Sequence, residues 1–122
     1  SSTMATGYLT THVLDTAIGR PAMGMKVDLF PIDRGHWQHI VTAVTNADGR
    51  TDGPILPAEA FLVGQYELLF YAGDYLNKLR PASDGPRFLD QIPIRFGVSD
   101  RNQHYHVPLL LTPFSYSTYR GS

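Results

Sequence analysis

Several polar side chains in this chain are of the types that move protons and stabilise negative charge. They fall at four places: His12 in the segment LTTHVLD, Arg50 after an Asp-Gly turn, the pair His104 and His106, and the final residues Tyr119, Arg120, Gly121 and Ser122. Histidine is the side chain whose ordinary pKa suits a base near pH 7. Arginine presents a planar fork of donors that can stabilise a developing oxyanion. We therefore interpret these places as candidates for water activation, charge stabilisation and substrate binding.

Each candidate also has a structural explanation when it is taken alone. A single histidine on a strand, such as His12, is most often a surface residue or a satisfied core residue. An arginine after a turn is usually a solvated charge, and Tyr119 could fill an interface. We interpret His36 and His39 as structural or exposed residues.

A metal centre is a second interpretation of the histidines. His104 and His106 lie two residues apart, so on a strand both imidazoles would project to one face, and with a distant histidine they could form a zinc ligand set. The spacing is a weak signal, because no Asp, Glu or Cys sits beside the pair. We therefore predict that the protein uses no metal and no cofactor.

The last nineteen residues must position the histidine pair, and their pattern predicts two strands. One face of the first strand carries His104, His106, Pro108 and Leu110, and the other carries Tyr105, Val107, Leu109 and Leu111. The second face is apolar or aromatic, so it should point into a core. Thr112-Pro113 breaks the run, and a second strand is expected at residues 115–119, with Ser117 and Tyr119 on one face. Proline in a strand usually marks an edge or a bulge. We expect that the backbone N–H missing at Pro108 costs no stability at this position.

Alternation and turn signals predict the remaining elements. Strands are expected at residues 8–15, 25–32, 37–45, 50–52, 65–72 and 91–98, with turns at 18–22, 34–35, 46–49 and 99–102 and a loop at 56–63. On the first strand, the alternation places His12 on the face opposite Leu9 and Val13. A short helix is expected at residues 75–79, with Asp74 as its N-cap. About eight short strands and one short helix predict an all-β, two-sheet sandwich.

Length and composition narrow the class further. The chain has 122 residues, a net charge of −1 and no cysteine, which indicates one domain without disulfides or thiol chemistry. We expect residues 1–7 to be a flexible leader and residues 8–122 to form the domain. With no charge runs, nucleic acid and membrane are not expected partners. The compartment cannot be read; a cytoplasmic location is favoured, and a periplasmic or peroxisomal one would require a targeting segment that was removed.

Several segments together resemble the 5-hydroxyisourate hydrolases, transthyretin-like enzymes of urate breakdown. These segments are LTTHVLD at residues 9–15, TNADGR at residues 45–50, and HYHVPLLL followed by SYSTYRGS at the C-terminus. The resemblance runs from about Tyr8 to Ser122, and the terminal Tyr-Arg-Gly-Ser is its most specific part. It implies a transthyretin-like β-sandwich that hydrolyses 5-hydroxyisourate to 2-oxo-4-hydroxy-4-carboxy-5-ureidoimidazoline. It also implies a homotetramer, a dimer of dimers around a central channel.

The resemblance assigns His12, Arg50, His106 and Tyr119 to the active-site positions of the family. We expect the two histidines to hold and deprotonate a water molecule. Arg50 should polarise a ring carbonyl or anchor the substrate, and Tyr119 should shape the floor of the site with Ser117.

The expectations for Arg120 and His104 differ from these. Arg120 should lie on the strand face opposite Tyr119 and hold the C-terminus, and a role for His104 stays open.

The alternative function is a transthyretin-like carrier of a small aromatic ligand, without enzymatic activity. At the four active-site positions transthyretin has Lys, Glu, Thr and Thr, so the residues present here argue against the carrier.

Overall fold

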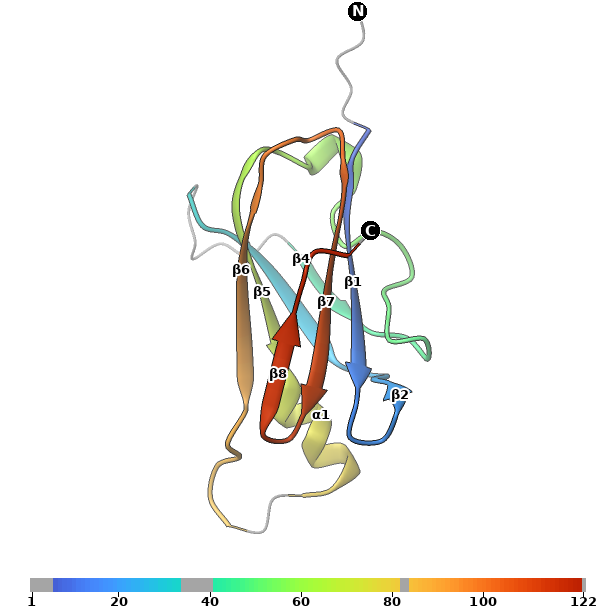
Figure 1. Ribbon diagram of the computed structural model, residues 1–122, viewed down its shortest axis with the longest axis vertical. Helices are drawn as coiled ribbons and strands as arrows, with labels where there is room; N and C mark the ends of the chain where they lie inside the picture. Colours follow the sequence, from blue (N-terminus) through green and yellow to red (C-terminus); the bar gives the residue numbers. More distant parts are fainter. Residues whose placement is uncertain (1–5, 34–40, 82–83, 122) are drawn as a thin grey trace, which may run out of the picture.

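Two sheets packed face to face make up the protein (Figure 1). The computed structural model describes residues 6–33, 41–81 and 84–121. Its strands are β1 Tyr8–Asp15, β2 Arg20–Pro21, β3 Lys26–Pro31, β4 Val41–Val44, β5 Gly64–Tyr71, β6 Gln91–Val98, β7 His104–Thr112 and β8 Ser115–Thr118. One α-helix, α1 Ala72–Leu79, and a 3₁₀ turn, Ala58–Ala60, complete the described elements. The predicted all-β sandwich with one helix is confirmed.

The strand order places the first strand, β1, beside β7, which in turn pairs with β8. One sheet has the order β2-β1-β7-β8 and the other β4-β3-β5-β6. The pairing of β1 with β7 is parallel, whereas the other pairings are antiparallel. In Figure 1 the C-terminal segment accordingly lies beside β7 and β1. Segments that are about 95 residues apart in the sequence therefore share one surface.

The core lies between the sheets and follows the alternation of the strands, with Pro108 as an additional buried residue of β7. On β1 the buried residues are Leu9, Thr11, Val13 and Asp15, and on β7 they include Tyr105, Val107, Leu109 and Leu111. Successive side chains of a strand point to opposite faces, so the residues between these project outward. The predicted faces of both strands are confirmed, and the histidines of β1 and β7 lie on the outer face of one sheet.

Helix α1 begins earlier than expected, and the prediction of Asp74 as its N-cap is wrong. The helix starts at Ala72, directly after β5, and Tyr71 is in the N-cap position. The N–H of the buried Gly73 in the first turn donates to the Asp90 carbonyl at 2.9 Å, and this bond replaces a side-chain cap. The early start also buries Tyr75, whose hydroxyl donates to a carboxylate oxygen of Asp15 at 2.9 Å. Asp74 lies in the first turn, where its charge still complements the helix dipole.

The expected strand at residues 50–52 is also wrong. Only Arg50 forms a bridge, and the segment otherwise bonds locally: the Asn46 side-chain oxygen accepts from the N–H of Arg50, and the Thr51 hydroxyl donates to the Gly53 carbonyl. The turn at residues 46–49 is confirmed, with Gly49 at a φ of 74°. The short strand β2, predicted only as part of a turn, pairs with the end of β1 instead.

Some expectations lie outside the described residues. They concern residues 1–5 of the leader, the turn at 34–35, the first part of the strand at 37–45, His36, His39 and Ser122. Thr6 and Gly7 are described, and they bond to Asn102 and Arg101 in the β6–β7 connection. In the part of the chain that is described, no helix has the length and apolar content needed to cross a membrane.

Candidate active site

The parallel register of β1 and β7 assembles the histidines. It pairs Thr10 with His106 and His12 with Pro108, so these side chains project from neighbouring positions on the outer face of the sheet. The ring centroids of His12 and His106 are 6.3 Å apart, with a tilt of 36° between the planes. A water molecule could contact both rings at this separation.

Arg50 reaches the histidines because the turn before it is docked onto β1. The Val13 N–H donates to the Gly49 carbonyl at 2.8 Å, and Arg50 forms an isolated bridge with His12. Gly49 has a positive φ of 74°, and a Cβ at this position would collide with the Val13 carbonyl oxygen. Only glycine therefore allows the turn to approach β1 closely enough to bring Arg50 beside His12.

The environment keeps both imidazoles neutral. Burial lowers the pKa of His12 below its ordinary value, the Arg50 charge lowers it further, and the Asp48 backbone and carboxylate partly oppose this. Burial likewise lowers the pKa of His106, followed by the charges of Arg50, His104 and His12. An imidazole with the ordinary pKa of about 6.5 is already mostly neutral at pH 7, and a lowered pKa increases the neutral fraction, so both rings can accept a proton there.

Thr10 is a site residue that the sequence reasoning missed. Its hydroxyl oxygen lies 2.6 Å from Nε2 of His104 and 2.7 Å from Nδ1 of His106. The Tyr8 ring stacks on His104, with centroids 4.3 Å apart and 16° between the planes. The alternation on β1 would have placed Thr10 on the face of His12, but its contact with both histidines depends on the register between strands.

These side chains border an open depression of about 390 Å³ in the outer face of the sheet. Its walls come from the outer residues of β1 and β7 and from the segment after the Gly49 turn: Tyr8, Thr10, Arg50, Asp52, His104 and His106 are among them. His12 lies next to the depression rather than in its wall. A planar molecule with several carbonyl groups would meet the guanidinium and at least one imidazole here.

The end of the chain closes onto the His106 backbone. The Gly121 N–H donates to the His106 carbonyl at 2.8 Å, which continues the register of β8 past its last residue, Thr118. A Cβ at Gly121 would lie 2.5 Å from Cδ2 of His106. The absence of a side chain at Gly121 thus leaves room for the imidazole.

The same register gives the positions of Ser117 and Tyr119. Ser117 pairs with Leu110, and Tyr119 falls opposite Pro108, so both lie on the outer face. Both are exposed, and Tyr119 borders a separate cleft beside Phe96 instead of the depression. In a single chain, Tyr119 and Ser117 are therefore on the histidine face but not against the histidines.

Pro108 lies in an interior strand, where proline is rare. It falls one position beyond Leu109 and Thr118, the last regular pair of β7 with β8. The Thr118 hydroxyl donates to its carbonyl at 2.7 Å. The missing N–H therefore removes no bond from the regular β7–β8 ladder.

Arg120 points to the other side of the sheet. Its guanidinium lies 4.0 Å from the ring centroid of Tyr105 and donates to the Gln103 side chain at 2.8 Å. It also donates to the His104 carbonyl at 3.4 Å. These contacts tie the C-terminal segment to the start of β7.

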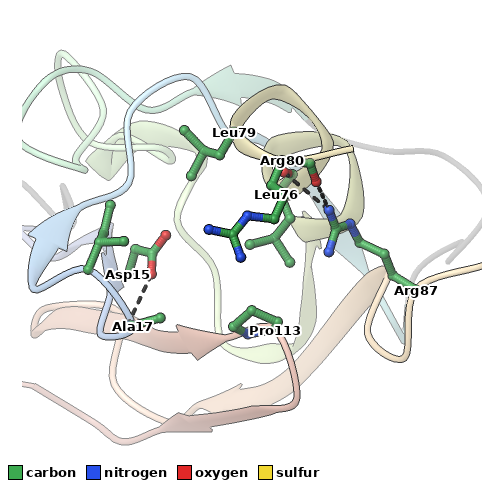
Figure 2. Close-up of a pocket in the computed structure, with 8 residues that line it drawn as sticks. Asp15, Ala17, Leu76, Leu79, Arg80, Arg87 and Pro113 are labelled. Carbon is green, nitrogen blue, oxygen red and sulfur yellow. Dashed lines mark hydrogen bonds between the residues drawn. The ribbon is translucent and has the colours of Figure 1, made fainter. Parts of the chain in front are cut away.

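A larger pocket, of about 440 Å³, lies between α1 and the C-terminal end of β1 (Figure 2). Its carboxylate, Asp15, already accepts from the Ala17 N–H at 3.1 Å and from Tyr75. The Arg87 guanidinium donates hydrogen bonds to the carbonyls of Leu76 and Arg80. Because these polar groups are used to hold the fold, we locate the candidate active site at the histidines instead.

No group of three His, Asp or Glu side chains among the described residues is arranged to hold a metal ion. His36 and His39 are outside that set. His104 and His106 do lie together, with ring centroids 6.0 Å apart. One nitrogen of each ring, however, is already within hydrogen-bond distance of the Thr10 hydroxyl.

Known proteins resemble this chain over nearly its whole length. The sequence profile of the HIUase/Transthyretin family matches residues 9–121. The 5-hydroxyisourate hydrolase 2 of Rhizobium meliloti (strain 1021) is 54% identical over 117 residues, which are 95% of this chain and 97% of that protein.

Solved structures agree with this likeness. The structure of Klebsiella pneumoniae 5-hydroxyisourate hydrolase is 31% identical, with a TM-score of 0.78 over 95% of this chain and 99% of that one. A crystal structure of (S)-allantoin synthase is 44% identical, with a TM-score of 0.91. It matches all of this chain, which spans only 46% of that longer protein.

Proposed function

This chain belongs to the HIUase/transthyretin family and hydrolyses 5-hydroxyisourate, and we propose that His12, Arg50 and His106 carry out that hydrolysis. The observation that supports the assignment is the pair of imidazoles with centroids 6.3 Å apart, both with a lowered pKa, beside one guanidinium. Hydrolysis of a ring amide needs a base for water and a positive group for the oxyanion, and this cluster contains both.

The first step uses an imidazole as the base. A water molecule held by His12 and His106 attacks a ring carbonyl carbon, and one of its protons passes to an imidazole nitrogen. The carbonyl oxygen becomes an oxyanion, which the Arg50 guanidinium stabilises. A fixed cation in a partly dehydrated site acts more strongly on such a charge than it would in water.

The second step opens the ring. The tetrahedral intermediate collapses, the bond between carbon and ring nitrogen breaks, and the leaving nitrogen takes a proton from the imidazolium. The imidazole is then neutral again and ready for another water molecule. The same histidine thus acts first as base and then as acid, and its lowered pKa makes the return of the proton favourable.

Assembly supplies the remaining wall of the site in this proposal. Tyr119 is 56% exposed, and the depression beside the histidines is open to solvent in a single chain. A site that excludes water needs a cover, and a second copy related by two-fold symmetry would provide one. We therefore propose a homotetramer, a dimer of dimers, in which the outer faces of the β2-β1-β7-β8 sheets meet and Tyr119 and Ser117 contribute to the floor.

The hydrolysis assay is the direct test of the assigned residues. His106→Asn and His12→Asn should each lower kcat by about 10²-fold or more, because general base catalysis contributes about 10²–10⁴-fold. His36→Asn makes the same chemical change at a histidine to which the proposal gives no role, and it should leave kcat unchanged. The assay follows the ultraviolet absorbance of freshly made 5-hydroxyisourate against its spontaneous decay. If His106→Asn keeps more than about half of the activity, His106 is not part of the mechanism.

Light scattering at the assay concentration tests the assembly. The expected result is a tetramer, and an active monomer would contradict a site completed by a second copy.

A further inference from the structure

The hydroxyl group of Thr10 is shared by two imidazoles. Its oxygen lies within hydrogen-bond distance of Nε2 of His104 and Nδ1 of His106, at 2.6 and 2.7 Å. In the described part of the chain, Nε2 of His106 has no hydrogen-bond partner. The two ring nitrogens of His106 therefore have different environments, and only Nε2 is free to accept a proton from water.

The proton of the hydroxyl decides which nitrogen of His106 is protonated. A hydroxyl has one hydrogen to donate and can accept from other donors. If it donates to Nδ1 of His106, the proton of the neutral ring must be on Nε2, and that nitrogen cannot act as a base. If it donates to His104 instead, Nδ1 of His106 carries the hydrogen and donates to the Thr10 oxygen, which leaves Nε2 unprotonated.

We propose that Thr10 and His104 set the tautomer of His106: His106 Nδ1–H donates to the Thr10 hydroxyl, which in turn donates to Nε2 of His104. Thr10 and His104 are positioning residues, and the inference rests on the proposed role of His106 as a base. The arrangement also suits the imidazolium that forms during hydrolysis, because Nδ1–H donates to the same oxygen before and after Nε2 takes a proton. No hydrogen bond has to be exchanged during the reaction.

The surrounding structure holds this chain of hydrogen bonds in place. The stacked Tyr8 ring fixes the plane of His104, with centroids 4.3 Å apart. The parallel pairing of β1 with β7 fixes Thr10 directly beside His106. On the far side of His106, Gly121 packs against the ring. In this arrangement Nδ1 of His106 faces the Thr10 hydroxyl.

Nitrogen-15 NMR of the histidine rings tests the tautomer without any use of activity. In the wild-type protein at neutral pH, His106 should carry its proton on Nδ1, although a histidine ring in water prefers Nε2–H. Thr10→Val removes the hydroxyl at nearly constant shape and should move the proton of His106 to Nε2. His104→Phe keeps a ring for Tyr8 to stack on but removes the acceptor, and it should shift the tautomer in the same direction. A wild-type His106 protonated on Nε2 overturns the inference.

Kinetics of the same variants test the consequence. Thr10→Val should lower kcat by about 10- to 100-fold, less than the full contribution of a general base, and it should change KM little. Thr10→Ser keeps the hydroxyl and should restore most of kcat together with the Nδ1–H tautomer. Thr16→Val is the matched control, because it removes a hydroxyl that donates to the Leu111 carbonyl and has no part in the proposed site, and it should leave kcat unchanged.

Two outcomes separate this inference from the proposed function. Full activity of Thr10→Val with an unchanged tautomer refutes the positioning role while leaving His106 as the base. Full activity of His106→Asn refutes the base, whatever the tautomer. Thermal unfolding of each variant identifies any loss of kcat that comes from loss of the fold, and the wild-type NMR measurement decides the tautomer even if Thr10→Val does not fold.

Discussion

Gly121→Ala should disable the enzyme by moving His106 while leaving the fold intact. The added Cβ would lie 2.5 Å from Cδ2 of the His106 ring, and 3.3 and 3.4 Å from its Cγ and Cβ. Carbon atoms in contact are normally about 3.5–4.0 Å apart. The ring and the C-terminal segment must therefore separate by about 1 Å at their closest point.

The size of the effect follows from that displacement. A misplacement of about 1 Å in a catalytic site can cost about 10²-fold in rate, or roughly 2.7 kcal/mol in the activation free energy. The loss of stability should be small by comparison, because Gly121 is the last described residue and its main tie is one bond to the His106 carbonyl. We expect kcat to fall by about 10²-fold while the melting temperature changes by only a few degrees.

The measurement combines the hydrolysis assay with thermal unfolding. Gly85→Ala is the control: an added Cβ there meets nothing within 4 Å, but the residue has a positive φ of 59°, so this change strains the backbone without touching the site. It should cost stability and leave kcat unchanged. Gly121→Ala with wild-type kcat would show that the end of the chain moves away freely and that Gly121 does not position His106.

Three further predictions concern charge, shape and metal. Because neutral imidazole is the base, activity should fall as the pH drops through the pKa of His106. Burial, and then the Arg50 charge, lower that pKa, so the midpoint of the activity loss should lie below about pH 6.5. In Arg50→Gln, an NMR titration should show a higher His106 pKa, and an unchanged or lower value would contradict this account. Tyr119→Thr should weaken hydrolysis and improve binding of long aromatic ligands, measured by calorimetric titration with thyroxine, whereas unchanged activity with no gain in affinity would mean that Tyr119 does not limit the site. Prolonged treatment with EDTA should leave activity intact, and complete loss restored by zinc would support the metal-dependent interpretation instead.

The local sequence was sufficient to predict most strands and which of their residues face the core. Residues 8–15 alternate between outward and core positions as predicted, and so do residues 104–111 apart from Pro108, which is buried. This worked because the side-chain period of a strand is two residues, so the face of His12 or His106 depends only on its neighbours. The turn at residues 46–49 could be predicted for a similar reason, since Asp-Gly allows the positive φ found at Gly49.

Local sequence failed where a distant contact decided the outcome. Asp is a common N-cap residue, but α1 starts three residues earlier than the sequence predicted. The Tyr75 hydroxyl bonds to Asp15 and the Gly73 N–H bonds to the Asp90 carbonyl, and both contacts favour the earlier start. The segment after Gly49 looked like a strand, yet it meets β1 through a single bridge at His12.

The candidate site itself required the tertiary structure. The sequence supplied His12, Arg50 and His106 as residue types, and the family resemblance related them to one reaction. Only the parallel pairing of β1 with β7 revealed Thr10 between His104 and His106, because those partners are 94 and 96 residues away along the chain. A shift of that register by one residue would send Thr10 away from both histidines. Register is set by the packing of the two whole strands, so no local pattern in the sequence could have specified which hydroxyl meets which imidazole.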